Sequence, residues 1–288
     1  MVRRHGPPRL SSLWIDAWHR LVRNRMAALG GIAIMLFVAL ALTAPWIAPH
    51  PYEAQIFDRL LRPSSQNPLG TDDLGRDQLS RLIYGARVSL TVGLISQGIV
   101  LLIGIPLGLM SGYYGGLIDA LIMRSTDAVL ALPTILLAIV MMAVMGRTLN
   151  NVFIAIGLSS WPHMARLVRG SAIAAREADY VEAARAVGTR DHSIIFRHIL
   201  PNILGPIIVA TTFGVPAAMM TEAFLSFIGI GVEPPLPSWG IMINDGFRWI
   251  RSRPELTLYP SLAITTVLLA FNFLGDGLRD ALDPTTQA

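Results

Sequence analysis

The chain has no cysteine and no lysine, so all 23 of its Lys and Arg positions are arginine. The lack of cysteine excludes disulfides, thiolate nucleophiles, cysteine zinc sites and iron–sulfur clusters. The lack of lysine excludes the phosphate-binding lysine of a Walker A loop and the amine of a Schiff-base enzyme. Any chemistry that needs a Walker A lysine must therefore take place on another chain.

Charged residues are also scarce. They make up 15% of the 288 residues, whereas hydrophobic residues make up 53%. A soluble domain carries roughly 25% charged residues, and a disordered chain carries far fewer apolar ones. The composition therefore predicts an integral membrane protein. The net charge of +4 is typical of arginine gathering on the cytoplasmic side of a membrane, so no nucleic-acid partner is expected.

Apolar stretches suggest an all-α protein with six transmembrane helices, because about 20 apolar residues cross a bilayer as a helix. The fourth stretch is the weakest, since it contains two asparagines and two serines. The expected spans are Met26–Ala48, Ser89–Tyr114, Ala128–Met145, Leu149–Met164, Ile203–Val232 and Leu256–Phe273.

Arginine placement predicts the orientation of these spans. The first 25 residues hold six arginines and one acid, which favours a cytoplasmic N-terminus, and six spans return the C-terminus to the same side. This segment is expected to form a helix in the cytoplasmic interface, and a disordered basic tail is the alternative. Its apolar residues recur at helical spacing: Leu10, Trp14, Trp18 and Leu21.

The spans divide the chain into predicted parts. Residues 1–25 form the cytoplasmic segment, residues 26–48 the first span, and residues 49–88 an extracytoplasmic loop. Residues 89–288 form a core that holds the other five spans and a long cytoplasmic loop at 165–202.

The cytoplasmic loop is too long for a simple turn and is predicted to contain two helices. Gly188 is expected to end the first helix in the left-handed conformation, and Thr189 or Asp191 to cap the second. An apolar face with small alanines can dock in a groove of another protein, or it can lie on the membrane or on its own chain. The residues of that face are Tyr180, Ala183, Ala184 and Val187.

Small and polar residues mark other positions in the spans. A carboxylate inside a membrane is costly, so Glu222 is either part of a pathway or a structural partner at a helix interface, and Gln97 has the same two interpretations. Glycines four residues apart in the second span favour close approach of another helix. They are Gly104, Gly108, Gly112 and Gly116.

Other chemistry finds little support. The acidic run Thr71–Asp77 is predicted to be a turn that caps the next helix, because a calcium loop needs twelve residues and a closing Glu. Ser159 with His163 nearby is a weak match to an intramembrane serine protease. No catalytic residue and no metal site are expected, since the six histidines are scattered.

Several motifs give the chain a family resemblance. Glu182-Ala183-Ala184, followed by Gly188 and Leu200-Pro201, resembles the EAA loop of permease subunits in ATP-binding-cassette (ABC) importers, although His198 stands where that family usually has Ile. Four further runs are similar to the C-type permease of dipeptide and oligopeptide importers: Leu69–Asp77, Tyr84–Leu90, Pro234–Gly240 and Gly275–Pro284. The resemblance extends from about residue 10 to 285.

This resemblance implies a type I ABC importer permease fold in a bacterial inner membrane, working by alternating access. It implies a second homologous permease, two cytoplasmic ATPase subunits that hold ATP and Mg²⁺, and an extracytoplasmic solute-binding protein, with no cofactor in this chain. The implied solutes are di- or oligopeptides, with a nickel complex or glutathione as alternatives. The implied coupling residues are Glu182, Ala183, Ala184, Gly188, Leu200 and Pro201.

A self-sufficient channel or secondary carrier is the alternative from another class. It would transport without any ATPase subunit. Neither it nor an intramembrane enzyme accounts as well for the long cytoplasmic loop.

Overall fold

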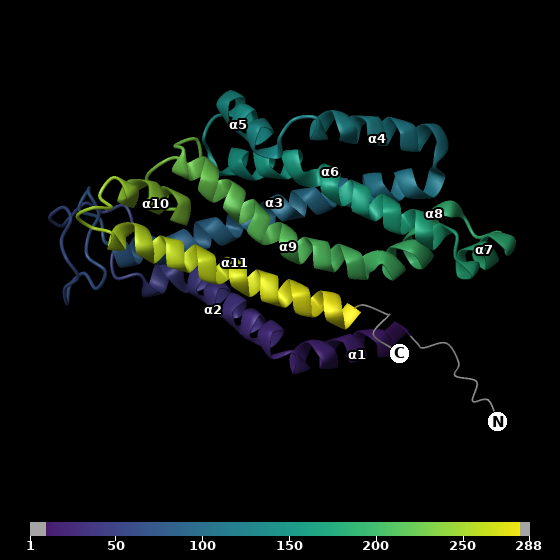
Figure 1. Cartoon of the computed structure of the whole chain (residues 1–288), viewed down its shortest axis with the longest axis horizontal. Helices are drawn as coiled ribbons and strands as arrows, with labels where there is room; N and C mark the ends of the chain where they lie inside the picture. The colour runs from purple at the N-terminus through teal and green to yellow at the C-terminus, as the bar shows by residue number, and fades with distance from the viewer. Residues whose placement is uncertain (1–9, 283–288) are drawn as a thin grey trace.

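The computed structural model describes residues 10–282, and this part of the chain is helical with no named strand (Figure 1). The prediction of an all-α fold is confirmed. The elements are α1 (Leu10–Arg23), α2 (Arg25–Ile47), α3 (Gln78–Tyr114), α4 (Gly116–Leu130), α5 (Thr134–Met145), α6 (Leu149–Arg176), α7 (Asp179–Ala186), α8 (Asp191–Ile194), the π-helical η1 (Ile195–Ile199), α9 (Leu200–Phe227), α10 (Trp239–Phe247) and α11 (Glu255–Leu282).

Helices α3 and α6 pack against each other at very short range. A Cβ atom on Gly104 would lie 2.8 Å from the Met164 Cβ, and one on Gly108 would lie 2.6 Å from the Ala165 carbonyl oxygen. Gly112 is equally close to α6. Because glycine has no side chain, the two backbones approach closely over this whole length.

The fourth glycine of the predicted ladder does not belong to this contact. Gly116 has a φ of +55° and begins α4, and no neighbouring atom lies within 4 Å of the position its Cβ would take. Helix α3 ends at Tyr114 because Gly115 and Gly116 both adopt positive φ, which turns the chain. Helix α4 then lies beside α6, where Arg169 makes two hydrogen bonds of 2.6 Å to Asp119.

Segments predicted to be cytoplasmic gather at one end of the molecule. Figure 1 shows one end of the long axis with α1, α7 and the end of α11. The opposite end holds α10 and the blue segment that follows α2. This arrangement agrees with the predicted division into inner and outer parts. Which end faces the cytoplasm stays a prediction.

Four helical segments within residues 10–282 are long and apolar enough to cross a membrane: α2, α3, the continuous run Asp191–Phe227 and α11. The bent pair α4 and α5 makes a fifth if it is counted as one span. Helix α6 has 28 residues and covers about 42 Å, but its asparagines, serines and arginines lower its hydropathy. The count of six spans therefore stays a prediction.

The predicted third span is wrong as a single helix. The helix is interrupted between Leu130 and Thr134, and α4 and α5 meet at an angle of 82°. The break falls at Pro133, which has no backbone N–H to donate and disfavours a helical residue before it.

Helices extend into two of the predicted segments outside the spans. Helix α3 begins at Gln78 within 49–88, because Asp77 caps it by accepting a 2.8 Å hydrogen bond from the Ser80 N–H. Helix α6 continues without a break to Arg176, within 165–202. The membrane boundaries of both segments stay predictions. The fifth span ends at Phe227 instead of Val232, where Gly229 adopts a φ of +83°.

The N-terminal helix is present as α1, and residues 1–9 lie outside the described part. Asn24 separates α1 from α2 and accepts hydrogen bonds from the N–H groups of Met26 and Ala27 at 3.1 and 3.2 Å. Trp18 is exposed, whereas Leu21 lies close to Gly277 of α11. Part of the predicted apolar stripe therefore packs on the protein itself; the side chains of Leu10 and Trp14 lie outside the described residues.

The α3–α6 contact gives a matched test. Gly108→Ala should destabilise the protein by about 1–3 kcal/mol, because the added methyl meets the Ala165 carbonyl and the Val168 side chain. Gly98→Ala, on the same helix with open space around it, should be neutral or stabilising, since Ala favours helices over Gly by about 1 kcal/mol. Thermal unfolding in detergent measures both, and equal midpoints would contradict the proposed close packing.

Candidate functional site

The segment after α6 folds into a compact helical element. Two residues of α7, Val181 and Ala184, are buried on its inner face. They pack with residues of α3, α6 and the α8–η1 segment in one apolar cluster, which includes Tyr113, Val168, Ala172, Ile194, Ile195 and Ile199. The element is therefore attached to the two most closely packed helices of the fold.

Gly188 ends α7 as predicted. It has a φ of +78°, its N–H donates to the Arg185 carbonyl at 2.9 Å, and the Thr189 N–H donates to the Ala184 carbonyl at 3.1 Å. These two bonds form a Schellman motif, which satisfies carbonyl groups at the end of a helix. A residue other than glycine would be strained at this φ.

The predicted cap of the next helix is wrong. Neither Thr189 nor Asp191 caps α8; the N-cap position is Arg190, without a side-chain hydrogen bond. The Asp191 carboxylate instead accepts a 2.7 Å hydrogen bond from the Tyr113 hydroxyl. The Asp191 side chain thus makes a tertiary contact to the end of α3 instead of a capping bond within α8.

Tyr113 is the main polar anchor of this element. Besides its bond to Asp191, Tyr113 makes a cation–π contact with Arg185, whose guanidinium carbon lies 5.3 Å from the ring centre. Its backbone carbonyl accepts a 3.1 Å hydrogen bond from Arg176 at the end of α6. One residue of α3 thus contacts the end of α6, α7 and the start of α8.

The predicted apolar face of α7 divides into two. Ala184 is buried, whereas Tyr180 is 41% exposed and Val187 81% exposed, and Ala183 is exposed as well. Glu182 lies beside them and is also exposed. The outward residues Tyr180, Ala183 and Val187, called here the exposed α7 face, have the i, i+3, i+7 spacing of one helix side.

Leu200 and Pro201 begin α9 and are half-buried. Just before them, η1 makes one wide π-helical turn, in which the Leu200 N–H donates to the Ile195 carbonyl. Ile195 and Ile199 point into the core, whereas Phe196 is 62% exposed. This turn has no signature in the sequence, because its apolar residues suit an α-helix equally well.

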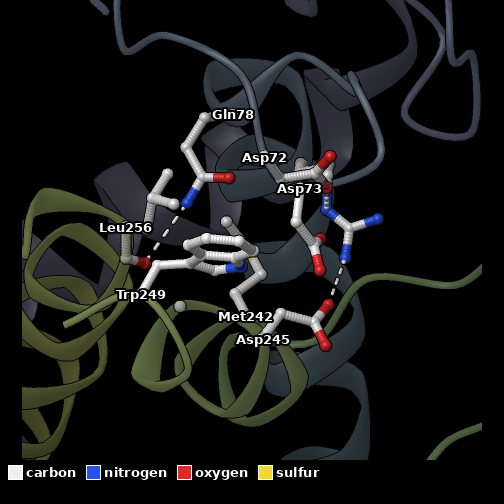
Figure 2. A pocket seen from close by; sticks show the side chains of 9 residues that line it. Asp72, Asp73, Gln78, Met242, Asp245, Trp249 and Leu256 are labelled. Atoms are coloured by element: carbon white, nitrogen blue, oxygen red, sulfur yellow. Dashed lines mark hydrogen bonds and ion pairs between the residues drawn. The ribbon is translucent and has the colours of Figure 1, made fainter. Parts of the chain in front are cut away.

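The opposite end of the molecule carries a buried charge cluster. Arg76 Nε lies 2.7 Å from the Asp72 carboxylate, and Arg81 lies 3.4 Å from Asp72 and 3.5 Å from Asp245 of α10. Figure 2 shows the Asp72 and Asp245 carboxylates on two sides of a guanidinium group. Burial raises the pKa of Asp245 above its ordinary value, against the effect of both arginines.

A small cavity beside this cluster is nearly filled. Its volume is about 10 Å³, which is room for one water molecule. Gln78 closes one side by donating a 3.3 Å hydrogen bond to the Leu256 carbonyl, and the side chains of Trp249 and Met242 also line the cavity (Figure 2). This cluster joins the segment between α2 and α3, predicted to be the outer one, to α3, α10 and α11, and it has no space for a solute.

The outer turn predicted at Thr71–Asp77 is confirmed as the cap of α3. Asp77 accepts hydrogen bonds from Asn67 at 2.9 Å and from the Ser80 hydroxyl at 2.7 Å. Asp72 accepts from the N–H groups of Leu74 and Arg76, both at 2.9 Å. These carboxylates are therefore engaged by protein donors.

The two polar residues of the spans lie at helix interfaces. Glu222 is fully buried and accepts a 2.6 Å hydrogen bond from Ser226, while its second oxygen has no partner among residues 10–282. Gln97 is buried beside Gly214 of α9. Ser159, the weak nucleophile candidate, is buried and donates to the Ile156 carbonyl at 3.0 Å, so its hydroxyl is already used.

Comparison with known families decides the identity. The sequence profile described as "Binding-protein-dependent transport system inner membrane component" matches residues 104–287. The chain belongs to this family. A second profile, the N-terminal transmembrane domain of oligopeptide transport permease C, matches residues 12–68 of the permease. The resemblance drawn from the motifs is confirmed, and the permease is an inner-membrane protein.

Curated relatives match almost the full length of the permease. A dipeptide transport system permease protein, DppC, of Alkalihalophilus pseudofirmus is 45% identical over 96% of this chain and 91% of its own length. A glutathione transport system permease protein, GsiD, of Pectobacterium atrosepticum is 43% identical over 96% and 92%. Both names describe subunits of transport systems and not enzymes.

A solved structure supports the fold of the permease. The MetNI methionine ABC transporter, in an inward-facing conformation, matches 70% of this chain and 96% of the compared chain with a TM-score of 0.57. Its sequence identity is 19%, so this likeness speaks for the ABC permease fold alone.

The outer charge cluster can be tested locally. Asp72→Asn removes the charge that faces Arg76 and Arg81, and should cost about 1–3 kcal/mol. The segment before α3 should then open more often, so trypsin should cut faster after Arg59, which is exposed and is followed by leucine. Asp58→Asn, an exposed carboxylate in the same segment without an ion pair among the described residues, should cut at the wild-type rate. Equal rates for both variants would contradict the anchoring role.

Proposed function

We propose that the permease is one membrane subunit of an ATP-driven importer and that α7 with Gly188 couples it to a separate ATPase. The observation that carries this proposal is the exposed α7 face. Tyr180, Ala183 and Val187 point away from a helix whose opposite side is firmly packed. An apolar helix face that stays exposed on a rigid support fits the groove of a partner protein.

The lysine-free composition supports the same division of labour. A Walker A loop needs a lysine, and this chain has none. ATP and Mg²⁺ therefore belong to partner subunits, for which we propose two cytoplasmic ATPases. A second, homologous permease would complete the pathway, and an extracytoplasmic binding protein would deliver the solute, in keeping with the family's description as binding-protein-dependent.

The mechanism we propose is alternating access. Closure of the ATPases on nucleotide would move α7, and α7 is connected through short segments to the long helices α6 and α9. A rigid helix transmits such a movement along its whole length. The nucleotide acts by favouring one permease conformation over the other, so its differential binding energy drives the change.

For the substrate we propose di- or oligopeptides. Relatives named for dipeptide and for glutathione are almost equally similar, at 45% and 43% identity. Glutathione is itself a short peptide, so both names agree on a small peptide-like solute. The filled outer cluster offers no solute pocket, which leaves the first selection to the binding protein.

The role of Gly188 is testable with a matched pair. Gly188→Val forces a branched residue into a left-handed conformation that costs roughly 1–2 kcal/mol, and should distort the end of α7. We expect an assembled transporter that hydrolyses ATP but imports little peptide. Gly170→Val, at an exposed glycine of α6 that also has open space around it, should keep import coupled. Normal import by Gly188→Val would sink the coupling role.

The substrate and the need for partners are tested by reconstitution. The assembled transporter in proteoliposomes should take up a radiolabelled dipeptide only with ATP and binding protein, and unlabelled oligopeptide should compete. Competition by a nickel complex alone would favour the alternative solute. ATP-independent uptake by this chain reconstituted alone would instead indicate a self-sufficient channel or carrier.

A further inference from the structure

A hollow opens next to the exposed α7 face. It lies between Gly188 and α9 and has a volume of about 380 Å³. Its lining residues come from one continuous stretch of the chain: Thr189, Arg190, His192, Ser193, Phe196 and Arg197. The Thr189 N–H is bonded to the Ala184 carbonyl of α7, so the hollow begins directly at the turn that ends this helix.

The hollow is positively charged. Arg190 and Arg197 are exposed and make no ion pair with any residue of the described chain. The acid nearest in sequence, Asp191, does not line the hollow, and its carboxylate accepts the Tyr113 hydroxyl instead. Two guanidinium groups are thus available, and guanidinium groups bind carboxylates through paired hydrogen bonds.

Helix α7, which precedes the hollow in the chain, carries exposed groups of the opposite sign. Asp179 and Glu182 of α7 are exposed, and neither makes an ion pair with a described residue. Arg185, the one cation on α7, lies over the Tyr113 ring. The surface therefore changes from acidic along α7 to basic in the hollow. Such a polarity gives two partners a preferred orientation and speeds their encounter.

We infer that the basic hollow receives an acidic segment of the ATPase subunit, and that the two signs of the surface fix the direction in which α7 lies in the ATPase groove. This inference rests on the proposed function and adds the chemistry of the partner. Only Gly188 separates Val187 of the exposed α7 face from Thr189 of the hollow, so an ATPase that covers the end of this face lies next to the hollow. Phe196 also lines the hollow and is 62% exposed, so it offers an apolar contact next to the acidic residues of the inferred ATPase segment.

The test measures ATPase binding as a function of salt. The assembled transporter is immobilised through this chain, and its ATPase subunits are dissociated and rebound at increasing NaCl. The double variant Arg190→Gln/Arg197→Gln should weaken rebinding roughly tenfold at low salt, and its affinity should change less with salt than that of the wild type. The pair Arg190→Lys/Arg197→Lys keeps the charge and should retain most of the salt dependence.

Two control variants distinguish a failure of the acidic-segment inference from a failure of the coupling role proposed for α7. Arg248→Gln/Arg251→Gln removes two exposed arginines near the α10 end and should leave rebinding unchanged. Ala183→Trp blocks the exposed α7 face and should abolish rebinding. If Ala183→Trp abolishes rebinding but the hollow variant binds normally at every salt concentration, the acidic segment is refuted while the coupling role survives. If neither variant weakens rebinding, both fail.

An anionic lipid is the competing occupant of the hollow. The measurement is therefore repeated in nanodiscs of pure phosphatidylcholine and in nanodiscs that contain phosphatidylglycerol. The inferred partner predicts the same loss in both. A loss confined to the phosphatidylglycerol nanodiscs would assign the hollow to lipid headgroups and overturn the inference.

Discussion

The close packing of α3 on α6 is the constraint on which the other features depend. Three glycines of α3 bring the two backbones together, and the side chains of α6 fill the space that is left. The charge cluster and the coupling element are both attached to α3. The outer charge cluster includes Arg81 near the beginning of α3, and Tyr113 near its end holds the coupling element. A single 37-residue helix therefore joins the two ends of the molecule.

The two ends differ in how they are held. At the end with the charge cluster, charges are buried and paired within the chain, and only the Arg81 Nη1 atom lacks a hydrogen-bond partner among the described residues of this cluster. The cavity beside them has room for about one water. At the α7 end, apolar and charged side chains point outward without partners among the described residues. The outer end thus stabilises the fold, whereas the other end presents a surface. This contrast is what supports a docking role for α7 and a structural one for Asp72 and Arg81.

Sequence reasoning found what local chemistry determines. The apolar runs located the helices, Gly188 marked the end of α7 because only glycine adopts its φ readily, and Asp77 was recognisable as a cap. The sequence does not predict features that depend on contacts between residues far apart in the chain. The Asp191 carboxylate bonds to Tyr113 instead of capping α8, and packing against α3 and α6 selects Val181 and Ala184 as the inner side of α7. The bend at Pro133 differs from the predicted single span, because the apolar run around this proline has the composition of a continuous membrane helix. The π-helical turn of η1 has no sequence signature.

The exposed α7 face has a further consequence for the life of the protein in the cell. Tyr180 and Val187 present apolar area to water, and such area is a binding site when a partner covers it and an aggregation liability when it stays bare. A permease made in excess of its ATPase leaves this face bare, and bare apolar surface promotes aggregation and is recognised by chaperones and proteases. The same side chains that dock the partner would thus mark an unassembled subunit for removal, which would keep the amounts of the subunits in balance.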